Sequence, residues 1–597
     1  MEPILSTAML IYIRMHRRHM CGIYGYIGKR EAAAILLEGI KKLEYRGYDS
    51  VGMATQDNDI FHIKKDVGAV DEVHAKVNFL DLPGTRGIVH TRWSTHGGVT
   101  KANAHPHASC GQKVVAIHNG IIENYEEMRK TLQQKGCVFV SETDSEVVPH
   151  YIEQKLAEGK DMPQAIMEFI KEAQGTFAIL MMVQGDDRIY ALRRDSPLVL
   201  GIGKGENYIA SDIYPFSQLT NKAIFFDNDE FAIIDPQGYL FVDANGTMLS
   251  KDIKEFEWKE VIDDKKYDHF MLKEIMEEPM VVKRLLLSLE TDQREEFQDL
   301  VRMIKSAHKI VFVAAGTSYH ATLLGAYYLH KCGIEAQTLI ASEFEHFAHV
   351  DETSLVIAFS QSGETMDVID ALKYAQARKA KVVSVVNVPY STIQRMSELY
   401  VNILAGQEVC VAATKSFVNQ VVLLLRIAKE FGLGINFDDL PADISKVFDK
   451  IPEIRTIAES VADKRDIYVL GRGLSYPVAR EMALKIKEIS YIHAEGMMGG
   501  ELKHGTIALI EDGTPVISLV GNNDTAMLSN TKEVEARGAR IIMIGTERGD
   551  IIVPTKHDGT FGILASVVGQ LLTYYIALKK GLPIDRPKNL AKSVTVR

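Results

Sequence analysis

The chain has 597 residues, of which 46% are hydrophobic and 25% are charged. This is the composition of a globular protein, and the length is too great for one hydrophobic core. The formal net charge of −11 and the absence of a long basic stripe exclude a nucleic-acid-binding surface, so small-molecule substrates are the expected partners.

Residues 1–20 precede Cys21, the first of five cysteines, and end in Met20. Their charges follow a short apolar patch, whereas a secretory signal has the reverse order. If Cys21 is the first residue of the mature protein, its own α-amine is available as a base for its thiol. We therefore expect translation to begin at Met20, and we expect residues 1–20 to be absent from the mature protein. Self-processing of a propeptide is the alternative.

Residues 21–240 predict one α+β layered domain. Two amphipathic helical patterns, at 31–45 and 145–159, interrupt a series of short β-branched and aromatic runs that predict strands. The predicted strands lie at 21–28, 87–92, 114–122, 177–183, 189–194, 198–203 and within 223–235.

From residue 241 the pattern changes. Residues 241–283 are weakly periodic and predict a linker. Residues 284–425 and 455–587 then each repeat the order strand, polar turn, helix, strand, which predicts two copies of a doubly wound α/β domain. Residues 588–597 form a C-terminal tail.

Two polar turns in the first copy predict a ligand site, because they follow strands and precede helices. Gly316–Ser318 and Ser360–Thr365 offer hydroxyls and backbone N–H groups that suit a phosphate dianion. No GxxxxGK[ST] or GxGxxG motif is present, which excludes the usual nucleotide sites. The alternative is that these hydroxyls cap helices.

The first domain carries the groups needed to attack a carboxamide. Cys21 is the candidate nucleophile, and Asn119 with Gly120 offers two N–H donors for an oxyanion. Arg92 can clamp a substrate carboxylate, and Asp144 can accept its amine. Each residue also has a plain alternative, since Cys21 can be a buried apolar group, Arg92 a surface cation and Asp144 a helix cap.

Several histidines of the first domain are spaced as in a metal site. However, Pro106 makes their segment a loop, and no acidic residue or cysteine that could be a further ligand adjoins it. We therefore expect no metal there. The five cysteines form no CxxC pair, which indicates a reducing, cytoplasmic setting without disulfides or structural zinc. No apolar run approaches the roughly 20 residues that span a bilayer, so no membrane association is expected.

Glu481, Lys485 and Glu488 share one stripe of a helix predicted around 478–492. A carboxylate held there could move a proton between adjacent carbons. The alternative is a solvated face with an ordinary Glu–Lys pair.

Several segments resemble the glutamine–fructose-6-phosphate aminotransferase family from Met20 to the last residue. The glutaminase-like segments are MCGIYGYIG, LEYRGYDSVGMA, HTRWSTHGG, NAHPH, HNGIIENY and FVSETDSE. The isomerase-like segments are GTSYH, SQSGET, AATKSF, KEISYIHAEG, GELKHG and RPKNLAKSVTV. The resemblance implies an N-terminal Ntn-hydrolase domain of four layers, αββα, followed by two sugar-isomerase (SIS) domains.

The resemblance also implies a role for each matching residue. Cys21 is the nucleophile, Asn119 and Gly120 form the oxyanion hole, Glu488 is the isomerisation base and Lys485 supports it. His504 opens the sugar ring from a neighbouring subunit, and Lys592 forms an imine with the open ketose. The glutamine site is matched by Arg92, Trp93, Thr95, His96, His105 and Asp144, with Trp93 gating an ammonia channel. The sugar-phosphate site is matched by Thr317, Ser318, Ser360, Gln361, Ser362, Thr365, Val411 and Ala591.

The activity implied is the conversion of glutamine and fructose 6-phosphate into glutamate and glucosamine 6-phosphate, the first step of amino-sugar synthesis. It needs no cofactor and no metal, and the borrowed His504 implies a homodimer. One alternative is another N-terminal-cysteine amidotransferase, such as the phosphoribosyl-pyrophosphate type, which needs an Asp-Asp pair after a strand. A second alternative is a sugar-phosphate sensor without activity.

Overall fold

The computed structural model describes residues 21–593 except 45–46, 94–96, 257–265 and 556. The chain divides into two compact units, which consist of residues 1–262 with 593–597 and of residues 263–592. The predicted extension at residues 1–20 lies outside the described residues.

The first unit contains two antiparallel sheets, in agreement with the predicted α+β domain. The eight-stranded sheet has the order β15-β11-β9-β10-β1-β4-β2-β3. Its strands are β1 Gly22–Ile27, β2 Ser50–Asp57, β3 Ile60–Val67, β4 Arg86–Arg92, β9 Val199–Ile202, β10 Asn207–Ala210, β11 Lys222–Phe225 and β15 Lys254–Glu255. The seven-stranded sheet has the order β14-β13-β12-β8-β7-β6-β5. Its strands are β5 His107–Ala108, β6 Val114–Ile122, β7 Gly175–Val183, β8 Ile189–Arg194, β12 Glu230–Ile234, β13 Tyr239–Asp243 and β14 Met248–Leu249.

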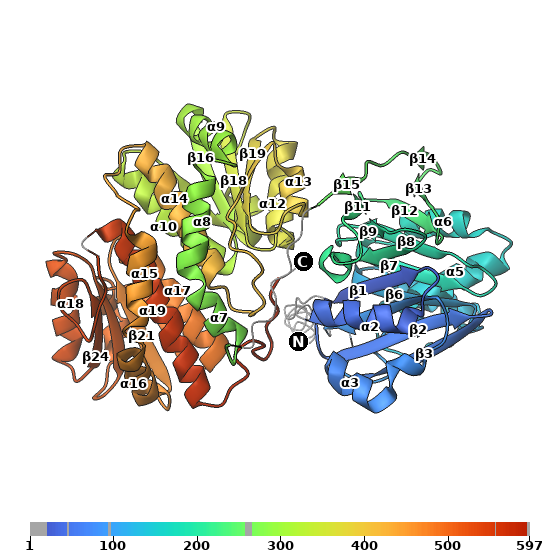
Figure 1. Ribbon diagram of the computed structural model, residues 1–597, viewed down its shortest axis with the longest axis horizontal. Coiled ribbons are helices and arrows are strands. Elements are labelled where there is room, and N and C mark those ends of the chain that lie inside the picture. Colours follow the sequence, from blue (N-terminus) through green and yellow to red (C-terminus); the bar gives the residue numbers. More distant parts are fainter. Residues whose placement is uncertain (1–20, 45–46, 94–96, 257–265, 556, 594–597) are drawn as a thin grey trace, which may run out of the picture. The chain divides into compact units, whose positions relative to one another are not determined.

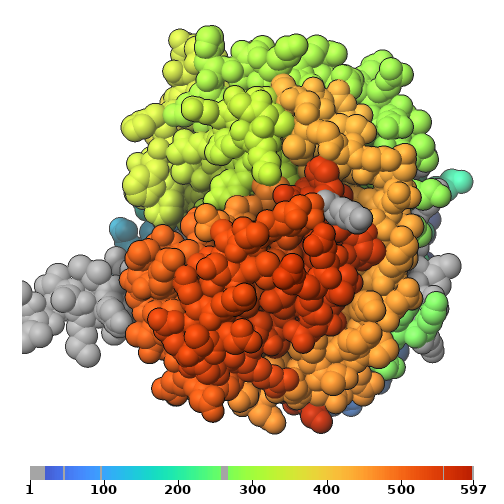
Figure 2. Space-filling model, turned by 90° about the vertical axis from the view of Figure 1, so that its left-hand side faces the viewer, coloured from blue at the N-terminus to red at the C-terminus, as the bar shows by residue number. Residues whose placement is uncertain are grey.

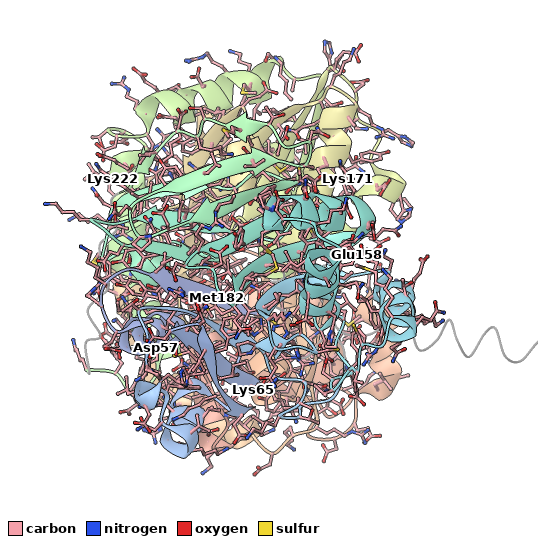
Figure 3. All side chains as sticks on the ribbon, turned by 90° about the vertical axis from the view of Figure 1, so that its right-hand side faces the viewer. Asp57, Lys65, Glu158, Lys171, Met182 and Lys222 are labelled. Carbon is pink, nitrogen blue, oxygen red and sulfur yellow. The ribbon has the colours of Figure 1, made fainter. Side chains whose placement is uncertain are left out.

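An apolar layer joins the two sheets, and helices cover their outer faces (Figure 1). Ile23 and Ile88 of the first sheet and Leu180 and Met182 of the second belong to one buried cluster; Met182 is labelled in Figure 3. The helices are α2 Ala32–Leu43 and α3 Val70–Val77 on the first sheet, and α4 Tyr125–Gln134, α5 Val147–Ala157 and α6 Met162–Glu172 on the second. The layers follow the predicted order αββα.

Gly39 allows α2 to lie close to β1. A Cβ atom at this position would come within 2.0 Å of the Tyr24 ring. The ring is fully buried, so a larger residue would displace the helix from the sheet that carries Cys21 at its start.

The second unit contains two parallel sheets with the same strand order, as the predicted duplication requires. One has the order β17-β16-β18-β19-β20, and the other has the order β22-β21-β23-β24-β25. The first comprises β16 Lys309–Ala314, β17 Gln337–Ile340, β18 Ser354–Ser360, β19 Lys381–Val386 and β20 Leu399–Asn402. The second comprises β21 Asp466–Gly471, β22 His493–Met498, β23 Pro515–Val520, β24 Arg540–Gly545 and β25 Ile551–Ile552.

Helices of both halves share one large core in this unit. Figure 2 shows the second half, in orange and red, packed against yellow-green residues of the first half. The helices are α7 Phe270–Met276, α8 Glu278–Ser288, α9 Arg294–Ser306, α10 Gly316–Lys331, α11 Phe344–Phe347, α12 Met366–Ala377, α13 Thr392–Met396, α14 Lys415–Glu430, α15 Leu440–Phe448, α16 Ile451–Val461, α17 Ser475–Ser490, α18 Thr525–Glu535 and α19 Asp558–Lys579.

Two sequence predictions differ from the structure. The predicted linker 241–283 holds β14 and β15, which pair with β13 and β11, and it also holds α7 and part of α8. Strands β14 and β15 have two residues each, which is too short to produce the alternation of apolar and polar residues that predicts a strand. The statement that no apolar run is long enough to cross a membrane is wrong for α19, which has 22 residues and whose most apolar 18-residue window has a mean hydropathy of 1.7. Since 89% of its most apolar window is buried, it is the central helix of the second unit's core.

Candidate active sites

Cys21 lies immediately before β1, beside the end of β4. Its sulfur accepts a hydrogen bond from the Trp93 backbone N–H at 3.3 Å. Burial raises the pKa of the thiol to about 11, and the Trp93 N–H and the charge of Arg92 offset only part of that effect. The thiol is therefore protonated at neutral pH, and nucleophilic attack requires a nearby base.

Asn119, on β6, contacts Cys21, and Gly120 follows it in the same strand. Asn119 Nδ2 donates to the Cys21 carbonyl oxygen at 2.9 Å. Gly120 has a φ of +120°, and a Cβ atom there would come within 2.1 Å of the Thr176 carbonyl oxygen. Only glycine fits this backbone position. The absence of a side chain here is consistent with a main-chain N–H that donates to a substrate.

His90 fixes the orientation of the Asn119 amide, a role that the sequence analysis missed. Its Nε2 lies 3.1 Å from both Asn119 Oδ1 and the His118 carbonyl oxygen. Both neighbours are acceptors, so Nε2 carries the proton and donates to them. Burial lowers the pKa of His90 to about 3, which keeps the ring neutral.

Replacing His90 with phenylalanine tests this positioning role. We expect the kcat of glutamine hydrolysis to fall roughly 10- to 100-fold with little change in KM, since loss of a whole oxyanion donor costs about 10²–10³. The ring still stacks on His105, whose centroid is 4.0 Å away. His90→Gln, which retains an N–H donor, should recover part of the rate. An equal loss in both variants, or a change confined to KM, would contradict the role.

Arg92 and Asp144 are both buried near Cys21, which excludes the interpretation of Arg92 as a surface cation. Arg92 donates to the carbonyl oxygens of Gly98 and Gly97 at 3.1 and 3.3 Å. Asp144 Oδ2 accepts the Ile122 N–H at 2.9 Å, so this carboxylate is held against the end of β6. The two side chains thus provide opposite charges in one protected region, as an amino-acid substrate requires.

The other residues predicted for the glutamine site are His105, Trp93, Thr95 and His96. His105 Nδ1 accepts the His118 N–H at 3.2 Å, so it supports β6. Trp93 is 6% exposed, and its ring makes an edge contact with Tyr48 at 5.0 Å. Thr95 and His96 lie outside the described residues.

In the second unit, α17 carries a buried charge network. Lys485 Nζ lies 2.5 Å from Glu488 Oε2 and 3.4 Å from Glu481 Oε1. Burial favours the neutral amine, but the two carboxylates outweigh it and raise the pKa of Lys485 above its ordinary value. The Lys485 side chain is 2% exposed, so the stripe is not a solvated face.

The same network reaches the first half of the unit through α10. Glu481 accepts hydrogen bonds from Thr317 Oγ1 at 3.0 Å and pairs with His320 Nδ1 at 2.7 Å. These partners, together with Lys485, lower the pKa of Glu481 in spite of its burial. Hydrogen bonds and an ion pair therefore join α10 of the first half to α17 of the second half. Glu481 on α17 lies on the stripe that was predicted to act on the sugar.

The predicted sugar-phosphate turns lie beside the point where the strand order reverses between β16 and β18. In open α/β sheets ligands bind at this position. Helix α10 begins at Gly316, so the predicted turn is the first turn of this helix. Thr365, the N-cap residue of α12, makes no side-chain cap, so the capping interpretation does not hold for this hydroxyl.

The hydroxyls of these turns instead bond within the site. Ser360 Oγ accepts the Gly363 N–H at 3.0 Å and lies 3.2 Å from Thr365 Oγ1. Ser318 Oγ accepts from Gln420 Nε2 at 3.0 Å. The Gln361 carbonyl accepts the Asn387 N–H, and Ser362 Oγ accepts the Glu364 N–H.

Lys592 forms an ion pair with Glu408, which the sequence analysis did not identify. Glu408 also accepts N–H groups of Thr414 and Ser416. Burial opposes ionisation, yet Lys592 and these donors lower the pKa of Glu408 to about 2. Thus the C-terminal tail is held by a carboxylate far away in the sequence.

The other predicted residues around the tail are less closely connected. The Val411 N–H donates to the Asp585 carbonyl oxygen at 3.0 Å, and Ala591 directly precedes Lys592. His504 is exposed at the end of a short 3₁₀ turn, Leu502–His504. Among the described residues, no hydrogen bond or ion pair joins its side chain to the network on α17.

Comparisons with known proteins support both halves. The SIS domain family matches residues 303–428 and 460–567, and the glutamine amidotransferase domain family matches residues 90–218. The chain is 42% identical over 603 residues to glutamine–fructose-6-phosphate aminotransferase (isomerizing) of Pyrococcus horikoshii, which covers 97% of this chain and 100% of that protein. The Methanothermobacter thermautotrophicus protein of the same name is 42% identical over 598 residues, with the same coverage.

Among solved structures, the C-terminal domain of glucosamine-fructose-6-phosphate aminotransferase from Francisella tularensis matches with a TM-score of 0.51 and 33% identity. It covers 54% of this chain and 100% of that chain. The sequence similarity thus extends over both units, and the structural similarity covers about half of the chain.

Proposed function

This chain belongs to the glutamine–fructose-6-phosphate aminotransferase (isomerizing) family, and we propose from that membership that it converts glutamine and fructose 6-phosphate into glutamate and glucosamine 6-phosphate. The observation that carries the proposal is the similarity to named relatives along 97% of the chain. The buried groups in each unit suit the two half-reactions.

The first half-reaction is hydrolysis of the glutamine amide. Arg92 holds the substrate α-carboxylate and Asp144 accepts its α-ammonium group, which brings the amide to Cys21. The free α-amine of Cys21 takes the thiol proton, and the sulfur attacks to form a thioester and release ammonia. Asn119 Nδ2 and the Gly120 N–H stabilise the oxyanion in each tetrahedral step. Water then releases glutamate.

The second half-reaction takes place on the open-chain sugar. The turns at 316–318 and 360–365 hold its phosphate, and His504 from a neighbouring subunit opens the ring. Lys592, held in position by its ion pair with Glu408, loses a proton to solvent and forms an imine at C2 with release of water. Ammonia replaces the lysine, and Glu488 moves a proton from C1 to C2 while Lys485 holds its carboxylate in position.

Ammonia is nucleophilic only when it is unprotonated, so we further propose that it passes between the sites without entering solvent, past Trp93. The burial of this indole beside Cys21 supports that role. The buried position of α19 and five free thiols support a cytoplasmic enzyme, and the exposed His504 supports a homodimer.

One isotope experiment tests the activity and the transfer together. The enzyme is incubated with fructose 6-phosphate, amide-¹⁵N glutamine and an excess of unlabelled ammonium, and the products are identified by mass spectrometry. We expect glucosamine 6-phosphate that carries ¹⁵N. Unlabelled product would contradict the protected transfer, whereas a different amino product would favour another amidotransferase. Sugar-phosphate binding without any product would favour the sensor.

A further inference from the structure

The first unit contains a second cluster of reactive side chains. Within the described part of the chain, none of its members contacts Cys21. Cys110 lies in the turn between β5 and β6, Cys137 follows α4, and His150 lies on α5. The two sulfurs and one ring nitrogen lie within 4.8 Å of one another. The cluster could not be predicted from the sequence, because the fold, rather than a spaced motif, brings the three residues together.

The imidazole of His150 is oriented as in a metal ligand. Its Nδ1 accepts the Cys110 backbone N–H at 3.2 Å and lies 3.2 Å from Cys110 Sγ, so this nitrogen is unprotonated and faces Cys110. Nε2 therefore carries the proton and lies 3.4 Å from Glu146 Oε1. A carboxylate behind a ligating histidine fixes its tautomer and strengthens it as a donor.

Glu146 is itself held in place by donors from its own segment. It accepts the N–H groups of Val140 and Ser141 at 2.8 and 2.7 Å, and the Ser141 hydroxyl at 2.6 Å. These bonds fix the carboxylate in position behind His150.

The two sulfurs differ in exposure and lie on neighbouring segments. Cys110 Sγ accepts the Val138 N–H at 3.1 Å, which fixes this sulfur beside the segment that carries Cys137. Cys110 is exposed and Cys137 is half-buried, so a fourth position faces water. Zinc bound at about 2.0–2.3 Å would hold tetrahedral ligands about 3.5–3.8 Å apart. The present separations require only small side-chain movements to reach those values.

We propose that Cys110, Cys137 and His150 form a binding site for Zn²⁺, with water as the fourth ligand. On binding, both thiols lose their protons to solvent, and the metal takes the Nδ1 lone pair that now accepts from Cys110. The ion joins the turn before β6 to the segment 137–146, which contains Asp144. This site is separate from both proposed active sites and needs no change in the proposed reaction.

The test is anaerobic titration of the metal-free, reduced full chain with Co²⁺, which replaces Zn²⁺ and reports its own geometry by absorption. We expect one tightly bound Co²⁺ per chain with the visible bands of a tetrahedral, thiolate-bound ion, and displacement of that ion by Zn²⁺. Cys110→Ser should remove the thiolate signal, and because Cys110 is exposed, the substitution changes little packing and leaves the fold intact. Glu146→Gln should weaken binding by about 10- to 100-fold.

Cys21→Ser and Cys332→Ser are the matched controls, because each removes a thiol outside the cluster. Both should retain the full Co²⁺ signal and the stoichiometry. An unchanged signal in Cys110→Ser would overturn the proposal. A Cys110–Cys137 disulfide in anaerobically purified chain that binds no Co²⁺ after reduction would also overturn it.

Discussion

Cys21→Ala should abolish glutamine hydrolysis and leave the conversion between fructose 6-phosphate and glucose 6-phosphate by the second unit intact. Loss of a nucleophile in a covalent hydrolase costs on the order of 10⁶ in rate. The second site retains Glu488, His504 and Lys592, and it carries its charge network entirely within residues 263–592. Glutamate release and sugar-phosphate isomerisation, measured on the same preparation, check this result.

Cys332→Ala is the matched control, because it removes another partly buried thiol in a different unit. It should leave both activities near the level of the unmodified chain. Loss of both activities in folded Cys21→Ala would contradict the two-site scheme.

The pH dependence of the unmodified enzyme follows from the same thiol. With a pKa of about 11, Cys21 alone would react only in strongly alkaline solution. An α-amine acting as base has a pKa of about 7.7–8.0, so glutaminase activity should rise between about pH 7 and 8 as the amine loses its proton. A chain that begins at Cys21 should show this rise, and a chain with residues attached before Cys21 should not hydrolyse glutamine. Equal rates in the two chains would exclude the free-amine mechanism.

The local parts of the fold were predictable because each depends on neighbouring residues. Alternating and continuous apolar runs predicted β6 and β7, and helical periodicity predicted α2 and α5. The duplicated pattern after residue 284 likewise predicted two parallel sheets, which have the same strand order. The two-residue strands β14 and β15 could not be predicted, since they exist only through pairing with β13 and β11.

In the candidate sites, too, some residues could be predicted from their own segments and others could not. Cys21 and Asn119 could be named from their own segments, because the chemistry of a thiol and an oxyanion donor is evident in the residue types. His90 and Glu408 could not, because their importance lies in contacts with Asn119 and with Lys592, which belong to other strands or to the tail. The network on α17 was only half predicted. Its spacing was evident, but its burial depends on His320 and Thr317 from another helix.

Glu488→Gln should lower glucosamine 6-phosphate formation by about 10²–10⁴ while sugar-phosphate binding persists, as expected when a general base is removed. The glutamine side chain keeps the shape but cannot take the C1 proton. Lys485 remains protonated beside it, since Glu481 still lies 3.4 Å away. Measurements of product formation and of the equilibrium binding of fructose 6-phosphate test whether the rate falls while binding persists. Glu459→Gln, at an exposed ion pair with Arg455 on α16, is the control and should be neutral.

Mixing subunits extends this prediction to the proposed dimer. If His504 acts in the site of a neighbouring subunit, inactive Glu488→Gln and His504→Ala chains should form mixed dimers with one intact site. Random exchange of equal amounts makes half of the dimers mixed, each with one of its two sites intact, so about a quarter of the unmodified activity should return. Glu488 and Lys485 belong to one helix, and His504 has no bond to them among the described residues. Since each variant chain lacks either Glu488 or His504, only subunit exchange can bring both side chains into one site. No recovery after verified exchange would mean that His504 acts within its own chain or not at all.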